Sequence, residues 1–236
     1  MSSSGAADSR RPTVLFDVDG TLVDTNYFQA VAWFRAFKQN GHQVAMVDVH
    51  RRIGLGSGQL IDELAPDRDT SRDDVLQAAH AEYYSGFYGL MTATAGAQDL
   101  LRAIRDRGAE VVLATSASAD ELAALRNALD IEDALATVTS SADVENAKPE
   151  PDILQAALEQ TATDPEHAIM VGDTVWDVQA AGKAGLSCIA LLTGGISRQA
   201  LEEAGAVAVY EDARDLLANL DDSPIGPLVR EAPNKD

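Results

Sequence analysis

Short apolar runs alternate with amphipathic segments over the second half of the chain. We expect strands at 110–115, 135–139, 168–171, 187–192 and 206–210, and helices between them at 97–107, 119–129, 152–160, 175–184, 197–204 and 212–220. An earlier apolar run, residues 14–16, adds a strand near the start of the chain. Strands separated by helices of this length imply right-handed crossovers and a parallel sheet covered on both faces. The pattern predicts an α/β, Rossmann-like three-layer core.

Between the first strand and residue 95 the periodicity is helical. We expect helices at 26–40, 48–53, 59–64 and 71–88, the first with an apolar stripe formed by Phe28, Val31, Ala32 and Phe34. No strand pattern interrupts this stretch. We therefore predict a catalytic core at 11–24 and 95–220, an all-helical cap domain inserted at 25–94, and flexible tails at 1–10 and 221–236.

Composition narrows the class of partner. With 38 acidic and 18 basic residues the formal net charge is -20, which argues against nucleic acid and anionic lipid. The same charge repels a phosphorylated ligand, so such a ligand needs a metal ion or a local basic group. The single cysteine, Cys188, excludes an internal disulfide and lies in an apolar run typical of a core thiol. No signal-peptide or membrane-length apolar run is present, so we expect a cytoplasmic protein.

Two carboxylates follow the first strand directly. Asp17 and Asp19 are two residues apart, so in an extended segment their side chains point to the same side. Close carboxylates repel each other, and a bound cation relieves that repulsion. The plainer interpretation is an acidic turn after a strand.

Three more polar clusters stand where other predicted strands end. They are Thr115 with Ser116, Lys148 before Pro149, and Asp173 with Asp177 one helical turn later. Ligands of open parallel sheets bind beyond the carboxyl ends of the strands, so the four clusters are expected to form one site.

Together the clusters offer ligands for a hard cation and groups that can bind a phosphate. Asp17, Asp173 and Asp177 are candidate ligands of Mg²⁺, which prefers oxygen ligands. A hydroxyl at Thr115 can bind a phosphate oxygen, and an ammonium at Lys148 can neutralise both carboxylates and a phosphoryl group. The alternatives are a helix N-cap for Asp173, an ordinary turn residue for Thr115 and a solvated side chain for Lys148.

In this order the four clusters resemble the motifs of the haloacid dehalogenase superfamily. The resemblance covers about 11–220 and is carried by Asp17-Val18-Asp19-Gly20-Thr21, Thr115, Lys148 and Gly172-Asp173-Thr174-Val175-Trp176-Asp177. A helical insert between the first and second motifs is similar to the family's helical-cap subclass, which includes phosphoglycolate phosphatases.

The resemblance implies a role for each residue. Asp17 would be the nucleophile that forms an aspartyl-phosphate, and Asp19 would be the general acid and base. Asp17 and Asp173 would bind Mg²⁺ directly, with the backbone carbonyl of Asp19 beside them and Asp177 close behind. The phosphoryl oxygens would be held by Thr115, Ser116 and Lys148.

Position 19 distinguishes the branches of the family. Relatives that displace halide carry an aromatic residue there and phosphonate-cleaving relatives a small one, whereas Asp19 suits phosphoester chemistry. The sugar phosphomutase branch has a histidine where Gln29 stands and basic cap residues for a second phosphate. We therefore predict a phosphatase of a small phosphorylated metabolite, with phosphoglycolate-type acids the usual assignment for similar sequences and a mutase as the alternative.

Specificity is expected to come from the cap. We predict substrate contacts from the glycine-rich loop around Gly56 and from Arg52, which could pair with a substrate carboxylate. The alternative is a flexible connector and a solvated arginine. Trp33, Trp176 and the four histidines are interpreted as structural or surface residues.

Two further classes remain open. A phospho-accepting signalling domain also places acidic residues, a Thr and a Lys at the ends of parallel strands, but needs no helical insert. A non-catalytic scaffold would have lost chemical residues that are all present here. Exposed cap aromatics would permit a homodimer.

Overall fold

The computed structural model describes residues 11–140 and 146–230. These residues form a six-stranded, wholly parallel sheet of order β3-β2-β1-β4-β5-β6. The strands are β1 Thr13–Phe16, β2 Glu110–Ala114, β3 Thr137–Thr139, β4 Ala168–Gly172, β5 Ser187–Leu191 and β6 Ala208–Tyr210. The predicted α/β class and parallel sheet are confirmed.

Strand β1 lies in the middle of the sheet, between β2 and β4. Val14, Leu15 and Phe16 are 0% exposed, as expected of a strand that is covered on both faces. Val14 and Phe16 belong to one hydrophobic cluster and Leu15 to the other, because alternate side chains of a strand point to opposite faces.

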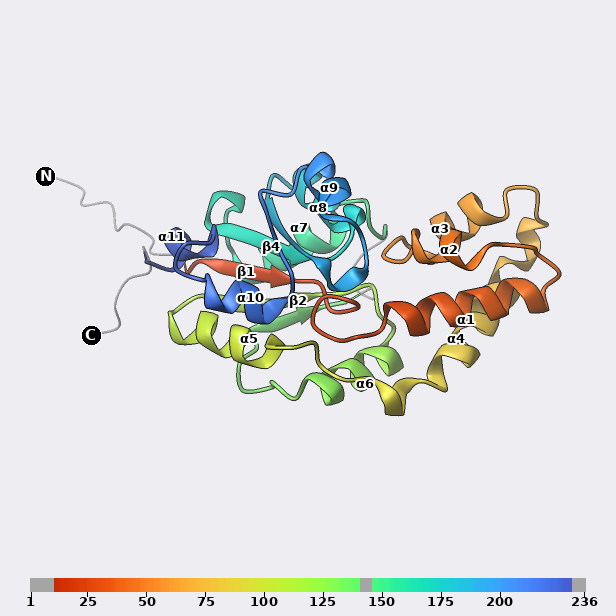
Figure 1. The fold of residues 1–236 in the computed structure, drawn as a ribbon, viewed down its shortest axis with the longest axis horizontal. Helices are drawn as coiled ribbons and strands as arrows, with labels where there is room; N and C mark the ends of the chain where they lie inside the picture. The colour runs from red at the N-terminus through yellow and green to blue at the C-terminus, as the bar shows by residue number, and fades with distance from the viewer. Residues whose placement is uncertain (1–10, 141–145, 231–236) are drawn as a thin grey trace, which may run out of the picture.

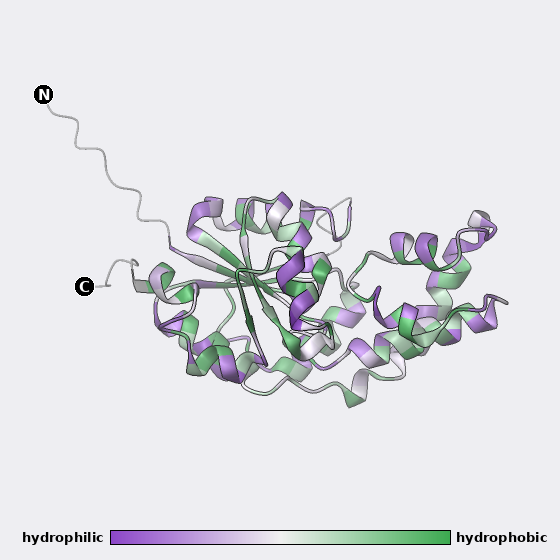
Figure 2. Cartoon of the chain, turned by 45° about the horizontal axis from the view of Figure 1, so that its top comes forward, coloured by the Kyte–Doolittle hydropathy of each residue, from purple (hydrophilic) through white to green (hydrophobic). Residues whose placement is uncertain are grey.

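Helices cover both faces of the sheet (Figure 1). On the side of Val14 and Phe16 lie α5 Ala97–Asp106, α6 Ala119–Leu129 and α10 Ala213–Ala218. On the side of Leu15 lie α7 Asp152–Thr161, α8 Val175–Lys183 and α9 Arg198–Ala204, with the short turn η5 Leu192–Gly194. The short turn η4 Pro165–His167 directly precedes β4. Figure 2 shows the hydrophobic strands between helices whose outer sides are hydrophilic.

The chain between β1 and α5 is helical and lies beyond one end of the sheet, opposite the two termini (Figure 1). It contains α1 Asn26–Gln39, α2 Met46–His50, α3 Ser57–Leu64, η1 Thr70–Arg72, α4 Asp73–Ser85 and η2 Tyr88–Leu90. A hydrophobic cluster that includes Trp33, Phe37, Leu60, Ile61 and Leu76 joins these helices. The division of the chain into a core and a cap stays a prediction.

The buried side of α1 differs from the predicted stripe. Its buried apolar residues are Ala30, Ala32, Trp33, Ala36 and Phe37, whereas Phe28, Val31 and Phe34 are partly exposed. Trp33 and Phe37 are one helical turn apart and pack into the cap cluster. The stripe was misplaced because most of α1 is apolar, so the sequence did not show which side the neighbouring helices cover.

The chain just after residue 220 packs on the core, whereas we predicted a flexible tail there. Helix α11, Ile225–Arg230, places Ile225 and Val229 in the main hydrophobic cluster, with 0% and 6% of their surface exposed. The hydroxyl of Ser223 donates to Leu220 O at 2.8 Å and accepts from Ile225 N at 3.2 Å. The predicted flexible tail is therefore wrong up to residue 230, while 1–10 and 231–236 lie outside the described residues.

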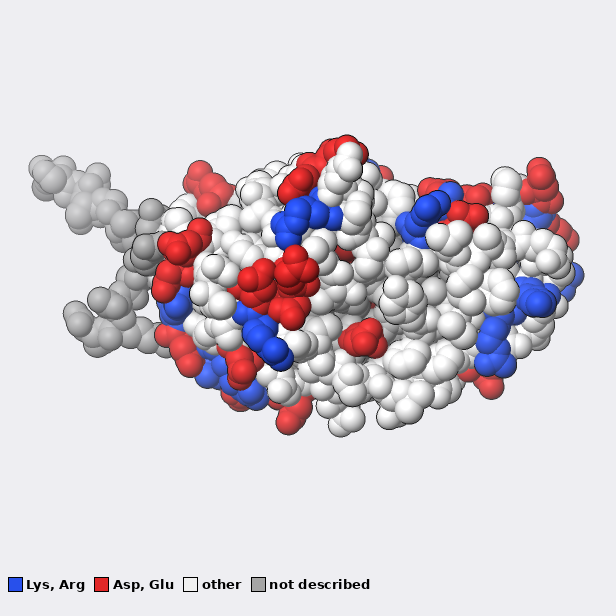
Figure 3. Space-filling view, in the orientation of Figure 1, with Lys and Arg blue, Asp and Glu red and all other residues white. Residues whose placement is uncertain are grey.

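Charge is distributed over the outside of the molecule. On the face shown in Figure 3, acidic side chains gather over the core near α9 and α10, with basic side chains interspersed. Within the described residues, no helix is both long and apolar enough to cross a membrane.

Candidate active site

The carboxyl end of β1 carries Asp17, whose carboxylate accepts a hydrogen bond from the ammonium of Lys148. The same ammonium lies 2.7 Å from Oδ1 of Asp177. All three residues are buried, and Lys148 is only 2% exposed. A single buried lysine therefore pairs with two carboxylates that the sequence places far apart, and the solvated alternative for Lys148 is wrong.

Asp173 follows β4, next to β1 in the sheet. Its Oδ1 accepts from the hydroxyl of Thr21 at 2.7 Å and its Oδ2 from the amide of Asn26 at 2.7 Å. Both partners are neutral, although Asp173 is 0% exposed. A Cβ atom on Gly194 would lie 2.0 Å from Oδ2, so only glycine leaves room for this carboxylate.

The cap of helix α8 is Thr174, and the N-cap alternative for Asp173 is wrong. The hydroxyl of Thr174 accepts from Asp177 N at 3.2 Å, and Oδ2 of Asp177 accepts from Thr174 N at 3.0 Å. This reciprocal capping box fixes the Asp177 side chain, and its other oxygen faces Lys148.

Asp17, Asp173 and Asp177 fit a divalent cation. Each offers a carboxylate oxygen, and these oxygens all lie within 4.8 Å of one another. Burial raises the pKa of Asp17 to about 7 even though Lys148 opposes the shift, and burial together with Asp177 raises the pKa of Asp173. Three close carboxylates and one ammonium leave an excess of negative charge, which a hard cation such as Mg²⁺ would neutralise.

Asp19 points toward the cap helices. The hydroxyl of Tyr84, on α4, donates to Oδ1 of Asp19 at 3.0 Å. Burial raises the pKa of Asp19, and the hydrogen bond from Tyr84 opposes the shift. The two aspartates of the first motif therefore differ in partner, because Asp17 contacts Lys148 of the core and Asp19 contacts the cap.

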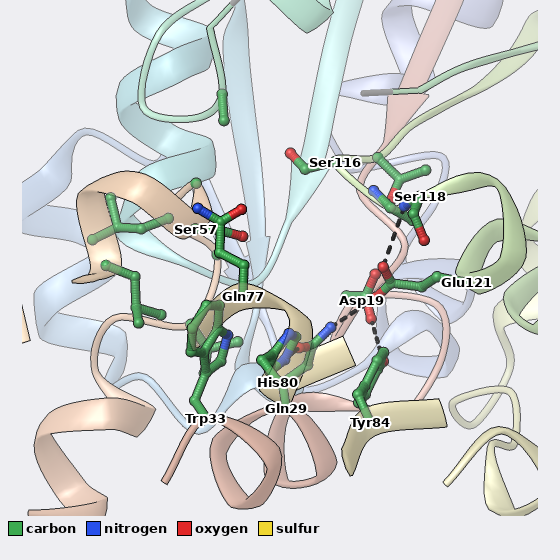
Figure 4. A pocket seen from close by; sticks show the side chains of 18 of the residues that line it. Asp19, Gln29, Trp33, Ser57, Gln77, His80, Tyr84, Ser116, Ser118 and Glu121 are labelled. Carbon is green, nitrogen blue, oxygen red and sulfur yellow. Dashed lines mark hydrogen bonds between the residues drawn. The ribbon is translucent and has the colours of Figure 1, made fainter. Parts of the chain in front are cut away.

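A cavity of about 600 Å³ lies between the core and the cap. The predicted site residues Asp17, Asp19, Thr115, Ser116 and Lys148 line it. In Figure 4, Trp33, Gln29, His80 and Tyr84 lie on one side and Asp19, Ser116, Ser118 and Glu121 on the other. The fold thus brings these five predicted residues, together with Gly56, to one cavity.

The two predicted cap contacts have different positions. Gly56 lines the cavity and donates its backbone N–H to Lys148 O at 3.1 Å. Arg52 donates to Glu63 Oε2 at 2.8 Å and to Asp48 O at 3.1 Å, and is not among the lining residues. The structure therefore supports Gly56 and does not bring Arg52 to the cavity.

Sequence reasoning missed a chain of hydrogen bonds that crosses from cap to core. His80 Nε2 donates to Gln29 Oε1 at 2.8 Å, and Gln29 Nε2 donates to Glu121 Oε1 at 2.8 Å. Trp33 stacks on His80 with the ring centroids 4.0 Å apart. Trp33 is structural, as interpreted, because it packs into the cap cluster, but it also lines the cavity. His80 lines the cavity too, which our interpretation of the histidines did not include. Residues 77, 80 and 84 recur at helical spacing, which is the signal that could have identified this wall.

Burial changes the pKa of the groups in this chain. The pKa of Glu121 is raised to about 8 by burial and by the nearby charge of Asp19. Burial also lowers the pKa of His80 to about 3, so its imidazole stays neutral near pH 7. His80 therefore supplies a hydrogen bond to the cavity wall without supplying a positive charge.

The raised pKa of Glu121 predicts how Glu121→Gln changes stability with pH. The folded protein holds a proton on Glu121 up to about pH 8, whereas the unfolded chain releases it near 4.5. Glu121 therefore contributes stability below about pH 4.5 that is lost as pH rises to 8. We expect Glu121→Gln to gain about 2–4 kcal/mol relative to wild type between pH 5 and 8.5.

Urea unfolding followed by tryptophan fluorescence, in EDTA at both pH values, measures this difference. Glu159→Gln makes the same chemical change on the exposed side of α7 and is the control. Equal pH dependence in wild type and Glu121→Gln would contradict the burial argument.

Comparison with known proteins decides the family of the chain. The family model of the haloacid dehalogenase-like hydrolases matches residues 14–191. The chain belongs to this family. The predicted family and the prediction of a hydrolase are confirmed.

Relatives of known name are moderately similar to this haloacid dehalogenase-like hydrolase. A phosphorylated carbohydrates phosphatase of Thermotoga maritima is 30% identical over 204 residues, covering 84% of this chain and 93% of that protein. A phosphoglycolate phosphatase of Pseudomonas putida is 26% identical over 220 residues, covering 90% and 81%. The crystal structure of a hydrolase from Pseudomonas syringae superposes with a TM-score of 0.85 at 31% identity, covering 90% and 99%.

Proposed function

We propose that this hydrolase is a magnesium-dependent phosphatase that cleaves a small phosphomonoester through an aspartyl-phosphate on Asp17. The observation that carries the proposal is the common wall of one cavity, where Asp17 and Asp19 lie beside Lys148 and Thr115. The names of the relatives from Thermotoga maritima and Pseudomonas putida, both phosphatases, support it.

Asp17 is positioned to act as the nucleophile. Its backbone N–H is anchored to Val171 O at 2.9 Å, and its carboxylate is held by Lys148. Attack of a carboxylate oxygen on phosphorus forms the Asp17–phosphoryl bond and breaks the bond to the leaving oxygen, which splits the hydrolysis into two displacements.

Asp19 is the proposed general acid and base. A protonated Asp19 gives its proton to the leaving oxygen, and the resulting carboxylate takes one from the water that attacks the aspartyl-phosphate. The raised pKa of Asp19 favours the protonated form that the first step requires. Tyr84 orients this carboxyl group toward the cavity through its hydrogen bond.

Positive charge comes from two sources in this proposal. Mg²⁺ held by Asp17 and Asp173, with Asp177 close by and the Asp19 carbonyl as a further ligand, would supply charge stabilisation for the phosphoryl group. Lys148 neutralises part of the carboxylate cluster, and Thr115 and Ser116 offer hydroxyls to phosphoryl oxygens.

We also propose a cytoplasmic location.

The cavity argues against the alternatives. A phosphomutase must hold a second phosphate, but among the described residues that line the cavity Lys148 is the only lysine or arginine. A phospho-accepting signalling domain needs an accessible phosphate, whereas Asp17 is 7% exposed beneath the cap.

Hydrolysis of p-nitrophenyl phosphate tests the proposal. Wild-type protein with millimolar Mg²⁺ is expected to release p-nitrophenol at a steady rate well above that of protein in EDTA. A wild-type protein that shows no turnover with Mg²⁺ would rule out phosphatase activity.

A further inference from the structure

Among the residues that the structure describes, none on the leaving-group side of the cavity can bind an anion by charge. Among its described lining residues, Lys148 is the only lysine or arginine, and its ammonium is already shared between Asp17 and Asp177. His80 is kept neutral by burial. A carboxylate or a second phosphate on the leaving group would enter without a counter-charge, which is unfavourable in a buried space.

A carboxylate of the protein itself occupies this side. Glu121, on α6, accepts from Gln29 Nε2 at 2.8 Å and from Ser118 N at 3.3 Å, and it forms no ion pair with any lysine or arginine that the structure describes. Asp19 lies on the same wall (Figure 4). An anionic leaving group would therefore meet two acidic side chains that offer it no positive charge, and Glu121 would repel it once it ionises above about pH 8. A hydroxyl or an ammonium would find acceptors on both side chains.

The cap contributes neutral polar and aromatic groups. Gln29, Gln77 and His80 offer hydrogen-bonding atoms, and Trp33 and Tyr84 offer ring surface. This mixture of amides and aromatic faces suits the hydroxyls and C–H surfaces of a polyol or the charge of an ammonium group.

Size points the same way. A cavity of about 600 Å³ has room for a leaving group of sugar size beside the phosphoryl group. Similarity to phosphoglycolate phosphatases shows the family of this chain and does not describe its leaving-group wall.

We propose that this enzyme selects phosphomonoesters whose leaving group carries no negative charge and offers several hydrogen-bond donors, as a sugar or amino sugar does, with Glu121 and Gln29 as the selecting residues. This inference rests on the proposed phosphatase function and names the substrate class of the same site.

A charge series of nearly equal size tests the proposal. Glucosamine 6-phosphate, glucose 6-phosphate and 6-phosphogluconate present an ammonium, a neutral and a carboxylate leaving group to the same cavity. We expect kcat/KM with Mg²⁺ to be at least tenfold higher for either of the first two than for 6-phosphogluconate. If glucosamine 6-phosphate has the highest kcat/KM, Glu121 binds the ammonium group. If glucosamine 6-phosphate and glucose 6-phosphate have equal values, Glu121 binds hydroxyls.

Glu121→Gln tests the residue. Glutamine keeps the size and the acceptor for Ser118 N but cannot ionise, so at pH 9, above the pKa of Glu121, 6-phosphogluconate should gain about fivefold in kcat/KM, mainly through a lower KM. Glu159→Gln, on the exposed side of α7, should leave all three values unchanged. Tryptophan fluorescence of an Asp17→Asn background, titrated with the same compounds, measures binding without turnover because Trp33 lines the cavity.

The results separate the two proposals. The inference is overturned if wild-type protein hydrolyses 6-phosphogluconate as fast as the other two sugar phosphates or faster. It is also overturned if wild-type protein hydrolyses p-nitrophenyl phosphate but neither glucose 6-phosphate nor glucosamine 6-phosphate. An unchanged ranking in Glu121→Gln overturns the role of Glu121. Absence of all turnover, p-nitrophenyl phosphate included, overturns the phosphatase function itself. The wild-type series decides the substrate class even if Glu121→Gln does not fold.

Discussion

Replacing Asp17 by asparagine is expected to lower kcat for p-nitrophenyl phosphate by about 10³-fold or more. The amide oxygen of asparagine is a poor nucleophile, so no covalent phosphoryl intermediate forms. Asparagine preserves the shape of the side chain and the backbone bond from Asp17 N to Val171 O. The measurement is steady-state release of p-nitrophenol with Mg²⁺, together with a urea unfolding curve that shows the variant is folded.

Asp19→Asn is the matched comparison. Its carboxylate is lost but Asp17 remains, and p-nitrophenol leaves without help from an acid. We expect this variant to accumulate one phosphoryl group that intact-protein mass spectrometry detects, whereas Asp17→Asn should accumulate none. Turnover by Asp17→Asn within tenfold of wild type would show that another group attacks phosphorus.

Removing Mg²⁺ is expected to reduce turnover by a comparable factor and to destabilise the fold. Asp17, Asp173 and Asp177 repel one another in the metal-free protein, and Lys148 offsets only part of that repulsion. A ligand at 100 times its Kd stabilises the folded state by about 2.7 kcal/mol. For a chain of this size, Mg²⁺ at that ratio should raise Tm by about 5–10 °C.

Scanning calorimetry with EDTA or with Mg²⁺ measures this shift. Asp173→Asn should lose most of it, because the variant removes a carboxylate that is 0% exposed and has only neutral partners. Glu166→Gln alters a second acidic group, exposed beside Asp164 and His167, and should keep the shift. Equal shifts in the two variants would place the metal elsewhere.

The core of the site was predictable because of a rule of parallel sheets. Asp17, Thr115 and Asp173 each follow a strand, and the carboxyl ends of parallel strands meet at one edge. Lys148 was found by its position before Pro149 and by the family motif. The structure places its ammonium between Asp17 and Asp177, which no local pattern could show.

The cap wall was not predictable in the same way. Gln29 and Glu121 are 92 residues apart and meet only because the cap packs over the core. Helical spacing reveals that residues share a side of a helix, but it does not reveal what that side contacts. Arg52 was predicted to contact the substrate because it is a basic residue near the glycine-rich loop. In the structure its guanidinium instead donates to Glu63.

The sequence by itself determined the parallel α/β class, the helical insert and the family, and it pointed to carboxylates that the fold brings close together. These depend on periodicity and on residues that adjoin strands, which are local features. Only the tertiary structure decided the burial of Ile225, the sharing of Lys148 and the acidic, cation-poor wall around Glu121. Each of these depends on which distant surfaces meet, because desolvation and charge pairing are properties of the packed molecule.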